Sequence, residues 1–389
     1  MFTALSEASS ASREGGPESK DCGNPGECIL AHYRRLAVME SERRRRGETE
    51  RMKFGVSVPA DPPTAHQIDK LLLAEQQGFD HGWVWDTHIL MQEYSPLMTL
   101  AATRTERLVI GSCVTNPVTR DPTVVASFFA TLANLVGGDR LVCGIGRGDS
   151  AVRIRRSKPA RLADLEDAIR IFHPLVRGDE VDYEGFPVQF SWASGGDVPI
   201  FLAAYGPKAL ALAGRVADGV ILQVADPYFV EWCIGQVRAS CEAAGRDWST
   251  FQVSVAAPSY VSSDRDEARE QLRWFGALVG NHVADILRHH DPASIPAELW
   301  SYVEGRTGYD YREHTRQNTS HADYVPDEVV DRFTVLGTAE ECLAKLTQLE
   351  RLGVTEFNLY TTFDNPERVI EVYGRDIIPV LAQAGRSEE

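Results

Sequence analysis

Short apolar runs of strand length alternate with longer amphipathic segments from residue 53 to the C-terminal region. The runs are rich in β-branched residues and predict eight strands, at 53–58, 82–86, 108–112, 141–145, 199–203, 219–224, 251–257 and 355–360. The segments between them, such as 124–135, carry apolar residues at helical spacing. Eight repeats of a strand and a helix predict an α/β fold, specifically a (β/α)8 TIM barrel.

Two stretches fall outside this repeat. Residues 1–51 are rich in Ser, Gly and charged side chains, which predicts a disordered N-terminal tail before a barrel domain of residues 52–389. Met52 stands directly before the first strand, so a natural start of the chain at Met52 is an open alternative. Roughly eighty residues after the seventh strand exceed any plain loop, and we expect a helical insertion at about 262–335 over the barrel mouth.

Composition and charge narrow the range of functions. The net charge of −16 and the pI of about 5.1 argue against binding nucleic acid or an anionic membrane, because phosphate contacts require clustered Lys and Arg. Seven scattered cysteines without a Cys-x-x-Cys pair predict a reducing, cytoplasmic location. No apolar run approaches the roughly 20 residues of a membrane helix, and no metal-ligand spacing, P-loop or nucleophile elbow occurs.

Polar residues follow the first three predicted strands, where the catalytic groups of a TIM barrel lie. Ser57 belongs to the end of the first strand, and Asp86 directly follows the apolar run Gly-Trp-Val-Trp, where a carboxylate requires a partner or a function. His88 is a candidate base or hydrogen-bond donor, with a histidine packed in the loop as the equal alternative. Thr115 and Asn116 offer donors and acceptors for the edge of a planar heterocycle, although a turn before the next helix would use the same residues.

The fourth and fifth strands end in glycine-rich corners. The fourth is followed by Gly146, Gly148 and Asp149, and the glycines allow the backbone to approach a ligand closely, without a Rossmann helix start after them. The fifth is followed by Tyr205, Gly206, Pro207 and Lys208. Glycine and proline at a helix start leave backbone N–H groups free at the positive end of the helix dipole, and the lysine adds charge. This pattern predicts a phosphate site, with a plain strand-to-helix turn as the alternative.

These corners carry a family resemblance. The segments GWVWDTH, VIGSCVTNPVTRDPTVVASFFATL, GIGRGD and VPIFLAAYGPKALALAGRVADGVIL resemble the bacterial luciferase-like superfamily of TIM-barrel flavin and deazaflavin enzymes. Within that superfamily the pattern is most similar to the coenzyme F420-dependent methylenetetrahydromethanopterin reductases. The resemblance extends over about residues 52–260 and resumes at 334–382, so it covers most of the chain.

The resemblance implies roles for individual residues. It implies that Asp86 lies at the active face of the cofactor and that the Cys113–Val114 peptide is a non-prolyl cis bond behind the ring. It further implies that Thr115 and Asn116 contact the ring or its ribityl chain, and that the cofactor phosphate lies at Gly206, Pro207 and Lys208. Three departures weigh against the pterin reaction: Ser57 replaces a glutamate, Asp86-Thr87-His88 replaces Asp-His, and Tyr205 replaces a glutamine.

The resulting prediction is an F420-dependent oxidoreductase that transfers hydride between a deazaflavin and a small organic substrate, with Asp86 and His88 polarising or protonating the reacting group. One alternative is an FMN-dependent monooxygenase that uses O2 and receives reduced flavin from a separate reductase. A second alternative is a non-catalytic, flavin-binding barrel, which predicts no open space above Asp86 and His88. By analogy with the family, we expect a homodimer or a higher oligomer.

Overall fold

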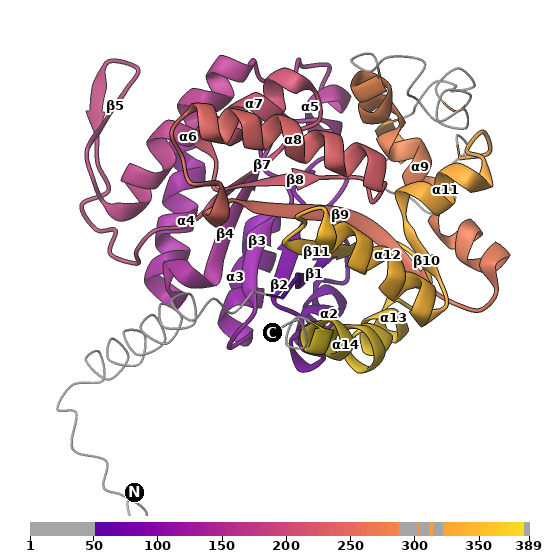
Figure 1. The fold of residues 1–389 in the computed structure, drawn as a ribbon. Helices are drawn as coiled ribbons and strands as arrows, with labels where there is room; N and C mark the ends of the chain where they lie inside the picture. The colour runs from indigo at the N-terminus through magenta and orange to yellow at the C-terminus, as the bar shows by residue number, and fades with distance from the viewer. Residues whose placement is uncertain (1–50, 288–301, 303–310, 314–321, 385–389) are drawn as a thin grey trace, which may run out of the picture. The chain divides into compact units, whose positions relative to one another are not determined.

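The computed structural model describes residues 51–287, 302, 311–313 and 322–384 (Figure 1). The tail predicted at 1–51 lies outside these residues, apart from Arg51. The Arg51 guanidinium pairs with the Asp80 carboxylate at 2.7 Å and 3.0 Å, which ties the start of the described chain to the barrel.

Eight parallel strands close into a barrel, which confirms the predicted fold class. In spatial order they are β1 (Lys53–Val58), β2 (His81–Val84), β3 (Val109–Ser112), β4 (Leu141–Ile145), β7 (Ile200–Ala203), β8 (Gly219–Leu222), β9 (Gln252–Val261) and β11 (Glu356–Tyr360). The ring closes because β11 pairs with β1 on one side and with β9 on the other. Each of these strands overlaps one of the eight predicted apolar runs.

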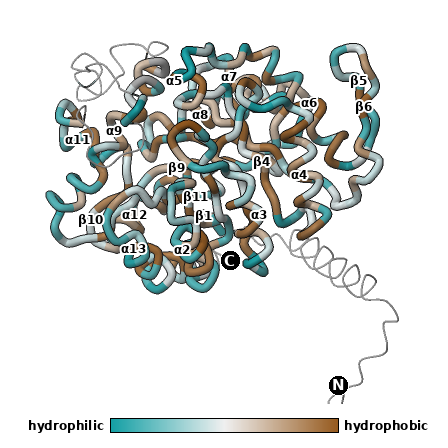
Figure 2. The backbone as a smooth tube through the Cα atoms, turned by 180° about the vertical axis from the view of Figure 1, so that it is seen from behind, coloured by the Kyte–Doolittle hydropathy of each residue, from teal (hydrophilic) through white to brown (hydrophobic). Residues whose placement is uncertain are grey.

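Helices cover the outside of the barrel (Figure 1). They are α2 (Thr64–Gln76), α3 (Tyr94–Arg104), α4 (Pro122–Val136), α5 (Ser150–Ile154), α6 (Leu162–Arg177), α7 (Pro207–Val216), α8 (Pro227–Ala243), α12 (Ala339–Arg351), α13 (Pro366–Val372) and α14 (Ile378–Ala384). Their apolar faces are buried, as at Leu165, Ile169 and Phe172 of α6. In Figure 2 the brown, hydrophobic stretches lie mainly toward the strands, whereas outer turns are teal. No described helix is long and apolar enough to cross a membrane.

The insertion after the seventh barrel strand contains helices, as expected. It includes α9 (Arg265–Leu287) and α11 (Asp327–Phe333), and much of the segment between them lies outside the described residues. Arg269 on α9 pairs with Asp331 on α11 at 2.8 Å, and Arg273 pairs with Asp327 at 2.7 Å. These ion pairs hold the two helices together.

Two elements are additional to the predicted repeat. A hairpin of β5 (Val181–Tyr183) and β6 (Phe186–Val188) follows α6, and β10 (Val335–Gly337) extends the far end of β9. The hairpin turn is formed by Glu184 and Gly185, both at positive φ, which suits the right-handed twist of a two-residue turn. Strands of three residues carry too few side chains for periodicity to reveal them.

A buried polar cluster lies inside the barrel below the strand ends. Glu356 on β11 is 3.0 Å from His81 Nδ1 and accepts a 2.7 Å hydrogen bond from Trp83 Nε1. Gly55 on β1 makes room for this contact, because a Cβ there would lie 2.4 Å from Glu356 Oε1. Burial disfavours the charged carboxylate, but the partners His81 and Trp83 outweigh it and lower the pKa of Glu356.

Candidate active site

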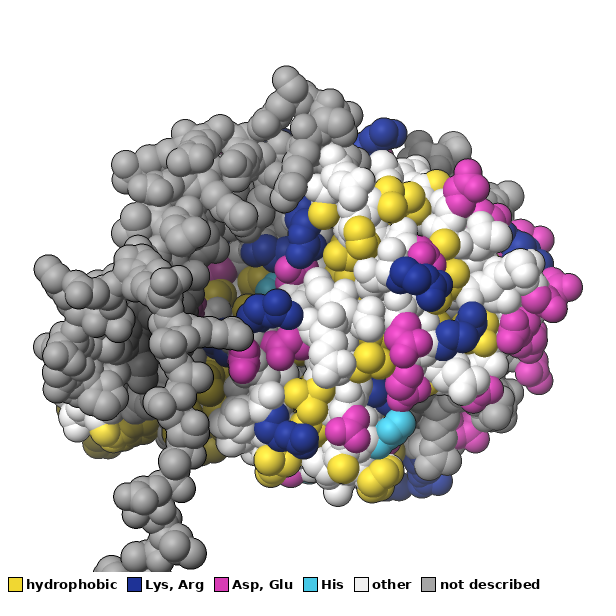
Figure 3. All heavy atoms as spheres, turned by 90° about the horizontal axis from the view of Figure 1, so that it is seen from below, with side chains coloured by type: hydrophobic (Ala, Val, Ile, Leu, Met, Phe, Trp, Pro, Cys, Tyr) yellow, Lys and Arg dark blue, Asp and Glu magenta, His cyan; other side chains and the backbone are white. Residues whose placement is uncertain are grey.

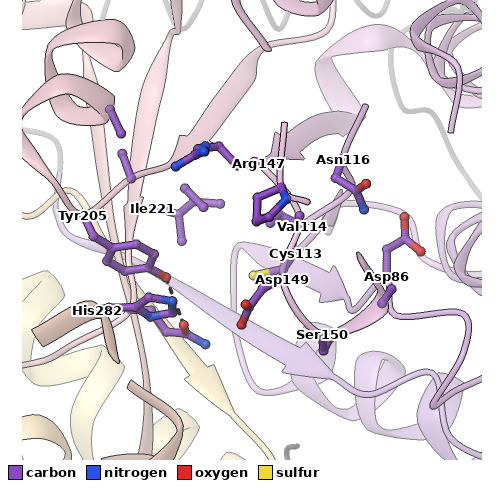
Figure 4. Close-up of a pocket in the computed structure, with 18 of the residues that line it drawn as sticks. Asp86, Cys113, Val114, Asn116, Arg147, Asp149, Ser150, Tyr205, Ile221 and His282 are labelled. Atoms are coloured by element: carbon purple, nitrogen blue, oxygen red, sulfur yellow. Dashed lines mark hydrogen bonds between the residues drawn. The ribbon is translucent and has the colours of Figure 1, made fainter. Parts of the chain in front are cut away.

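A cavity of about 690 Å³ lies where the barrel strands end (Figure 4). It is lined by eleven of the fourteen residues predicted for the site: Asp86, Cys113, Val114, Asn116, Gly146, Gly148, Asp149, Tyr205, Gly206, Pro207 and Lys208. Thus the ends of β2, β3, β4 and β7 converge, as expected for a barrel whose site forms on one rim.

Three predicted residues lie elsewhere. His88 is exposed on the loop after β2 and does not line the cavity, so it is not the packed loop histidine of the alternative interpretation, and its catalytic role stays a prediction. Ser57 is wholly buried in β1. Thr115 is also buried: its N–H donates to Gly144 O and its carbonyl accepts from Gly146 N, both at 2.9 Å, because the β3–β4 ladder continues through it. None of these three residues lines the cavity.

The Cys113–Val114 peptide is cis, as the family resemblance implied. Both residues line the cavity, and Figure 4 shows them between the wall that carries Tyr205 and the wall that carries Asp86. Gly146 allows the neighbouring strand end to approach, since a Cβ there would lie 3.1 Å from Val114 Cγ2. A bare peptide edge and a valine methyl face the cavity at this point.

Asn116 is partly committed to its own loop. Its Oδ1 accepts from the backbone N–H groups of Val118 and Thr119, at 3.1 Å and 2.9 Å. Asn116 can therefore both form the turn before α4 and contact a ligand, because the turn uses its Oδ1 and leaves the Nδ2 donors for a ligand. The following loop ends at Asp121, whose carboxylate caps α4 by accepting from Thr123 N at 2.8 Å.

Asp86 has a fixed partner. The Arg120 guanidinium binds both carboxylate oxygens, with Nε–Oδ2 at 2.8 Å and Nη2–Oδ1 at 2.9 Å, and also contacts Glu93 Oε2 at 2.8 Å. Burial opposes the charge of Arg120, but the hydrogen bonds to Asp86 and Glu93 prevail and raise its pKa. The arginine also lies over the Tyr94 ring, 4.6 Å from its centroid. This bidentate pair fixes the orientation of the Asp86 carboxylate at the edge of the cavity.

The start of α7 forms another part of the cavity wall. Gly206 is the N-cap and Pro207 the first helical residue, and a Cβ built on Gly206 would meet no atom within 4 Å. Pro207 has no N–H and Ala209 N donates to Gly206 O at 3.0 Å, so the N–H groups of Gly206 and Lys208 are the ones that a ligand could use at the positive end of the helix. Lys208, Arg147 and Arg153 also line the cavity, and Arg153 is paired with Asp149 at 2.7 Å. The cavity thus carries basic groups although the chain is acidic overall.

On the face shown in Figure 3, acidic and basic side chains of the described residues lie intermixed. The basic groups around the cavity, Arg147, Arg153 and Lys208, suit a small anionic ligand.

Several lining residues were absent from the sequence prediction: Trp85, Ile221, Gln223, His282 and Tyr360. Gln223 and Tyr360 stand at the ends of β8 and β11, so the rule that identified Asp86 would also have found them. His282 comes from α9 and stacks on Tyr205, with ring centroids 3.9 Å apart and planes at 4° (Figure 4). This contact joins the end of a barrel strand to a helix of the insertion, and nothing in the local sequence indicates it.

These features fit a phosphorylated planar cofactor. Val114, Ile221 and Trp85 provide apolar surface, and the N-terminus of α7 with Lys208 provides backbone N–H donors and a positive charge. Fold and cavity together define a TIM-barrel protein with a cavity, at the carboxyl ends of its strands, whose lining suits a flavin-like molecule.

Comparison with known proteins agrees. The family model of luciferase-like monooxygenases matches residues 48–356, and the chain belongs to this family. A 5,10-methylenetetrahydromethanopterin reductase from Methanolobus tindarius is 32% identical over 84% of this chain and 100% of its own length. The structure of the F420-dependent tetrahydromethanopterin reductase from Methanopyrus kandleri matches with a TM-score of 0.69 at 21% identity, covering 86% of this chain and 100% of that one. An F420-dependent secondary alcohol dehydrogenase in complex with an F420–acetone adduct matches with a TM-score of 0.69 at 22% identity, covering 85% and 99%.

Proposed function

We propose that this chain is an F420-dependent oxidoreductase that transfers hydride between the deazaflavin and a small organic substrate. The observation that carries the proposal is one cavity that combines the apolar surface of Val114, Ile221 and Trp85 with the N-terminus of α7 and Lys208. The named relatives, an archaeal reductase and structures of F420-dependent enzymes, support the cofactor class.

The cavity residues divide into positions for the ring and positions for the phosphate. Val114 and the cis peptide would support the ring, Asn116 Nδ2 would donate to its polar edge, and the first N–H groups of α7 with Lys208 would bind the phosphate. When bound, the deazaflavin supplies a hydride donor or acceptor. Asp86, which accepts two hydrogen bonds from Arg120, would lie at the active face of the ring.

Basic groups at the cavity favour F420 over FMN. Arg147, Arg153 and Lys208 suit the acidic polyglutamate tail of F420, which FMN lacks. The FMN-dependent monooxygenase, supplied by a separate flavin reductase, is the second candidate because the family as a whole is named for monooxygenases. A non-catalytic barrel is less well supported, since Asp86 lines open space.

Separate fluorescence titrations of the purified protein with F420 and with FMN test the proposal. We expect tight, saturable binding of F420 and weak binding of FMN. Tight binding of FMN alone would replace the proposal by the monooxygenase, and binding of neither would remove the enzyme interpretation.

Lys208→Ala is expected to weaken F420 binding by about tenfold or more, because a charge-assisted contact with phosphate is worth roughly 1.5–3 kcal/mol. The same titration measures the loss. Arg215→Ala is the matched control, since it removes a positive charge from the far end of the same helix, where the side chain pairs with Glu166. Equal affinities of wild type and Lys208→Ala would contradict the phosphate assignment.

The remaining properties are also proposals. We infer a reducing, cytoplasmic setting, which the five free cysteines of the described residues support: Cys113, Cys143, Cys233, Cys241 and Cys342. A homodimer or higher oligomer is inferred by family analogy, and analytical ultracentrifugation tests it. The partners proposed are a small-molecule substrate and no nucleic acid or membrane.

A further inference from the structure

Two tyrosines and a glutamine from three strand ends meet on the cavity wall. Tyr205 Oη lies 2.9 Å from Gln223 Oε1, and Gln223 Nε2 lies 3.2 Å from Tyr360 Oη. All three residues line the cavity, and the dashed line in Figure 4 marks the first of these bonds. His282 fixes the Tyr205 ring by parallel stacking. Gln223 therefore bridges two phenols whose rings are held in place.

The bridge determines which phenol keeps a proton to donate. An amide oxygen only accepts and an amide nitrogen only donates, so Tyr205 gives its proton to Gln223 while Tyr360 receives one from it. The hydroxyl proton of Tyr360 is then left for a third group. Turning the amide over would exchange the two tyrosines, yet one phenol proton would still remain to be donated.

The surroundings of Tyr360 make it a fixed, neutral donor. Its ring packs edge-on against Trp85, with centroids 4.9 Å apart. Burial raises the pKa of Tyr360 well above its usual value, so the phenol keeps its proton at physiological pH. Cys113 Sγ lies 3.8 Å from the hydroxyl, and sulfur is a weak acceptor. An oxygen atom of a ligand would be a stronger acceptor than this thiol.

We propose that Tyr360 donates a hydrogen bond to the oxygen of a substrate from the class of ketones, aldehydes and their alcohols, with Gln223 and Tyr205 as positioning residues. The inference rests on the proposed F420-dependent function and narrows its substrate class. The apolar surface of Trp85, Val114 and Ile221 suits an uncharged substrate body.

The reaction balances with the proposed cofactor. In the reductive direction, hydride from reduced F420 adds to the carbonyl carbon, a C–H bond forms, and the π pair of the C=O bond moves to oxygen. That oxygen then takes a proton from water, and F420 is oxidised by two electrons. The hydrogen bond from Tyr360 stabilises the negative charge that develops on the oxygen.

Tyr360→Phe tests the donor while it keeps the ring contact with Trp85. With F420-loaded protein and secondary alcohols from 2-propanol to cyclohexanol as probes, we expect kcat to fall about 10²-fold, as for other single donors to a developing oxyanion. The KM for the alcohol and the affinity for F420 should change by less than about tenfold. Tyr373→Phe is the matched control, because Tyr373 is buried, donates to Ser259 Oγ at 2.7 Å and lies outside the cavity lining.

Gln223→Glu tests the direction of the hydrogen bonds through pH. A protonated carboxyl has one donor and one acceptor, like the amide, whereas a carboxylate accepts from both phenols and captures the Tyr360 proton. The variant should therefore match wild type at low pH and approach the activity of Tyr360→Phe as pH rises through the new carboxyl pKa. The titratable groups around this position include Tyr205, Tyr360, Cys113, Cys233, His282 and Asp149, and the wild-type profile gives their contribution.

The outcomes separate the two proposals. Failure of F420 to bind wild type would remove the proposed function itself. If F420 binds but no alcohol in the series reduces it and no corresponding ketone oxidises its reduced form, the substrate class is wrong. Wild-type kcat in Tyr360→Phe, or a Gln223→Glu profile without an added pH step, would overturn the role of Tyr360.

Discussion

Replacing Arg120 with methionine is expected to lower the free energy of unfolding by about 3–5 kcal/mol, the usual cost of removing one partner of a buried ion pair. The Asp86 side chain is only 1% exposed and would lose both of its hydrogen bonds, whereas Glu93 is 42% exposed and would be rehydrated. Urea unfolding measures the loss, and F420 binding should weaken with it because Asp86 lines the cavity.

Two further variants isolate the pair. Arg170→Met removes an exposed ion pair with Glu166 and should cost less than about 1 kcal/mol. Asp86→Asn in the Arg120→Met background should recover part of the lost stability, because no unpaired carboxylate then remains buried. Wild-type stability in Arg120→Met would show that the carboxylate does not depend on the guanidinium.

The single variant Glu356→Ala is expected to lower the free energy of unfolding by about 3–5 kcal/mol. The change removes the acceptor for Trp83 Nε1 and the partner of His81, and it leaves a void between strands. Denaturant unfolding at neutral pH measures the effect. Glu350→Ala is a suitable comparison on the nearby surface helix α12, where the carboxylate accepts from Met52 N at 3.0 Å.

The same carboxylate predicts a pH dependence. Because the folded-state pKa of Glu356 is lowered, its contribution to stability is present at neutral pH and is lost as pH falls through the carboxyl range, below about 4.3 for the unfolded chain. The difference in stability between wild type and Glu356→Ala should therefore shrink at acidic pH. A difference that grows on acidification would contradict this assignment.

The barrel strands could be predicted from local apolar runs because a residue buried on either face of the sheet is usually apolar. A parallel barrel strand is covered on both faces, so its sequence is a continuous apolar run, and each of the eight runs became a strand. The hairpin at 181–188 and the short strand β10 carry no such signal, since the hairpin residues are partly exposed. The insertion was recognisable by its length alone.

The site residues that could be predicted from the sequence are those that lie next to each other in the chain at the end of one strand. Gly206, Pro207 and Lys208 follow each other in the chain, so their grouping at the start of α7 was evident. The partnership of Asp86 with Arg120 joins residues 34 positions apart, and the stack of Tyr205 on His282 joins the barrel to the insertion. Such contacts depend on the packing of distant elements, which no local pattern contains. His88, two residues after Asp86, is exposed and lies outside the cavity lining, which its position in the sequence did not reveal.

A crystal structure of the protein with F420 bound tests the central claim most directly. We predict that the deazaflavin ring lies against the cis Cys113–Val114 peptide, with the cofactor phosphate at the first N–H groups of α7 and Lys208. A ring bound outside this cavity, or a phosphate held by another part of the chain, would contradict the account.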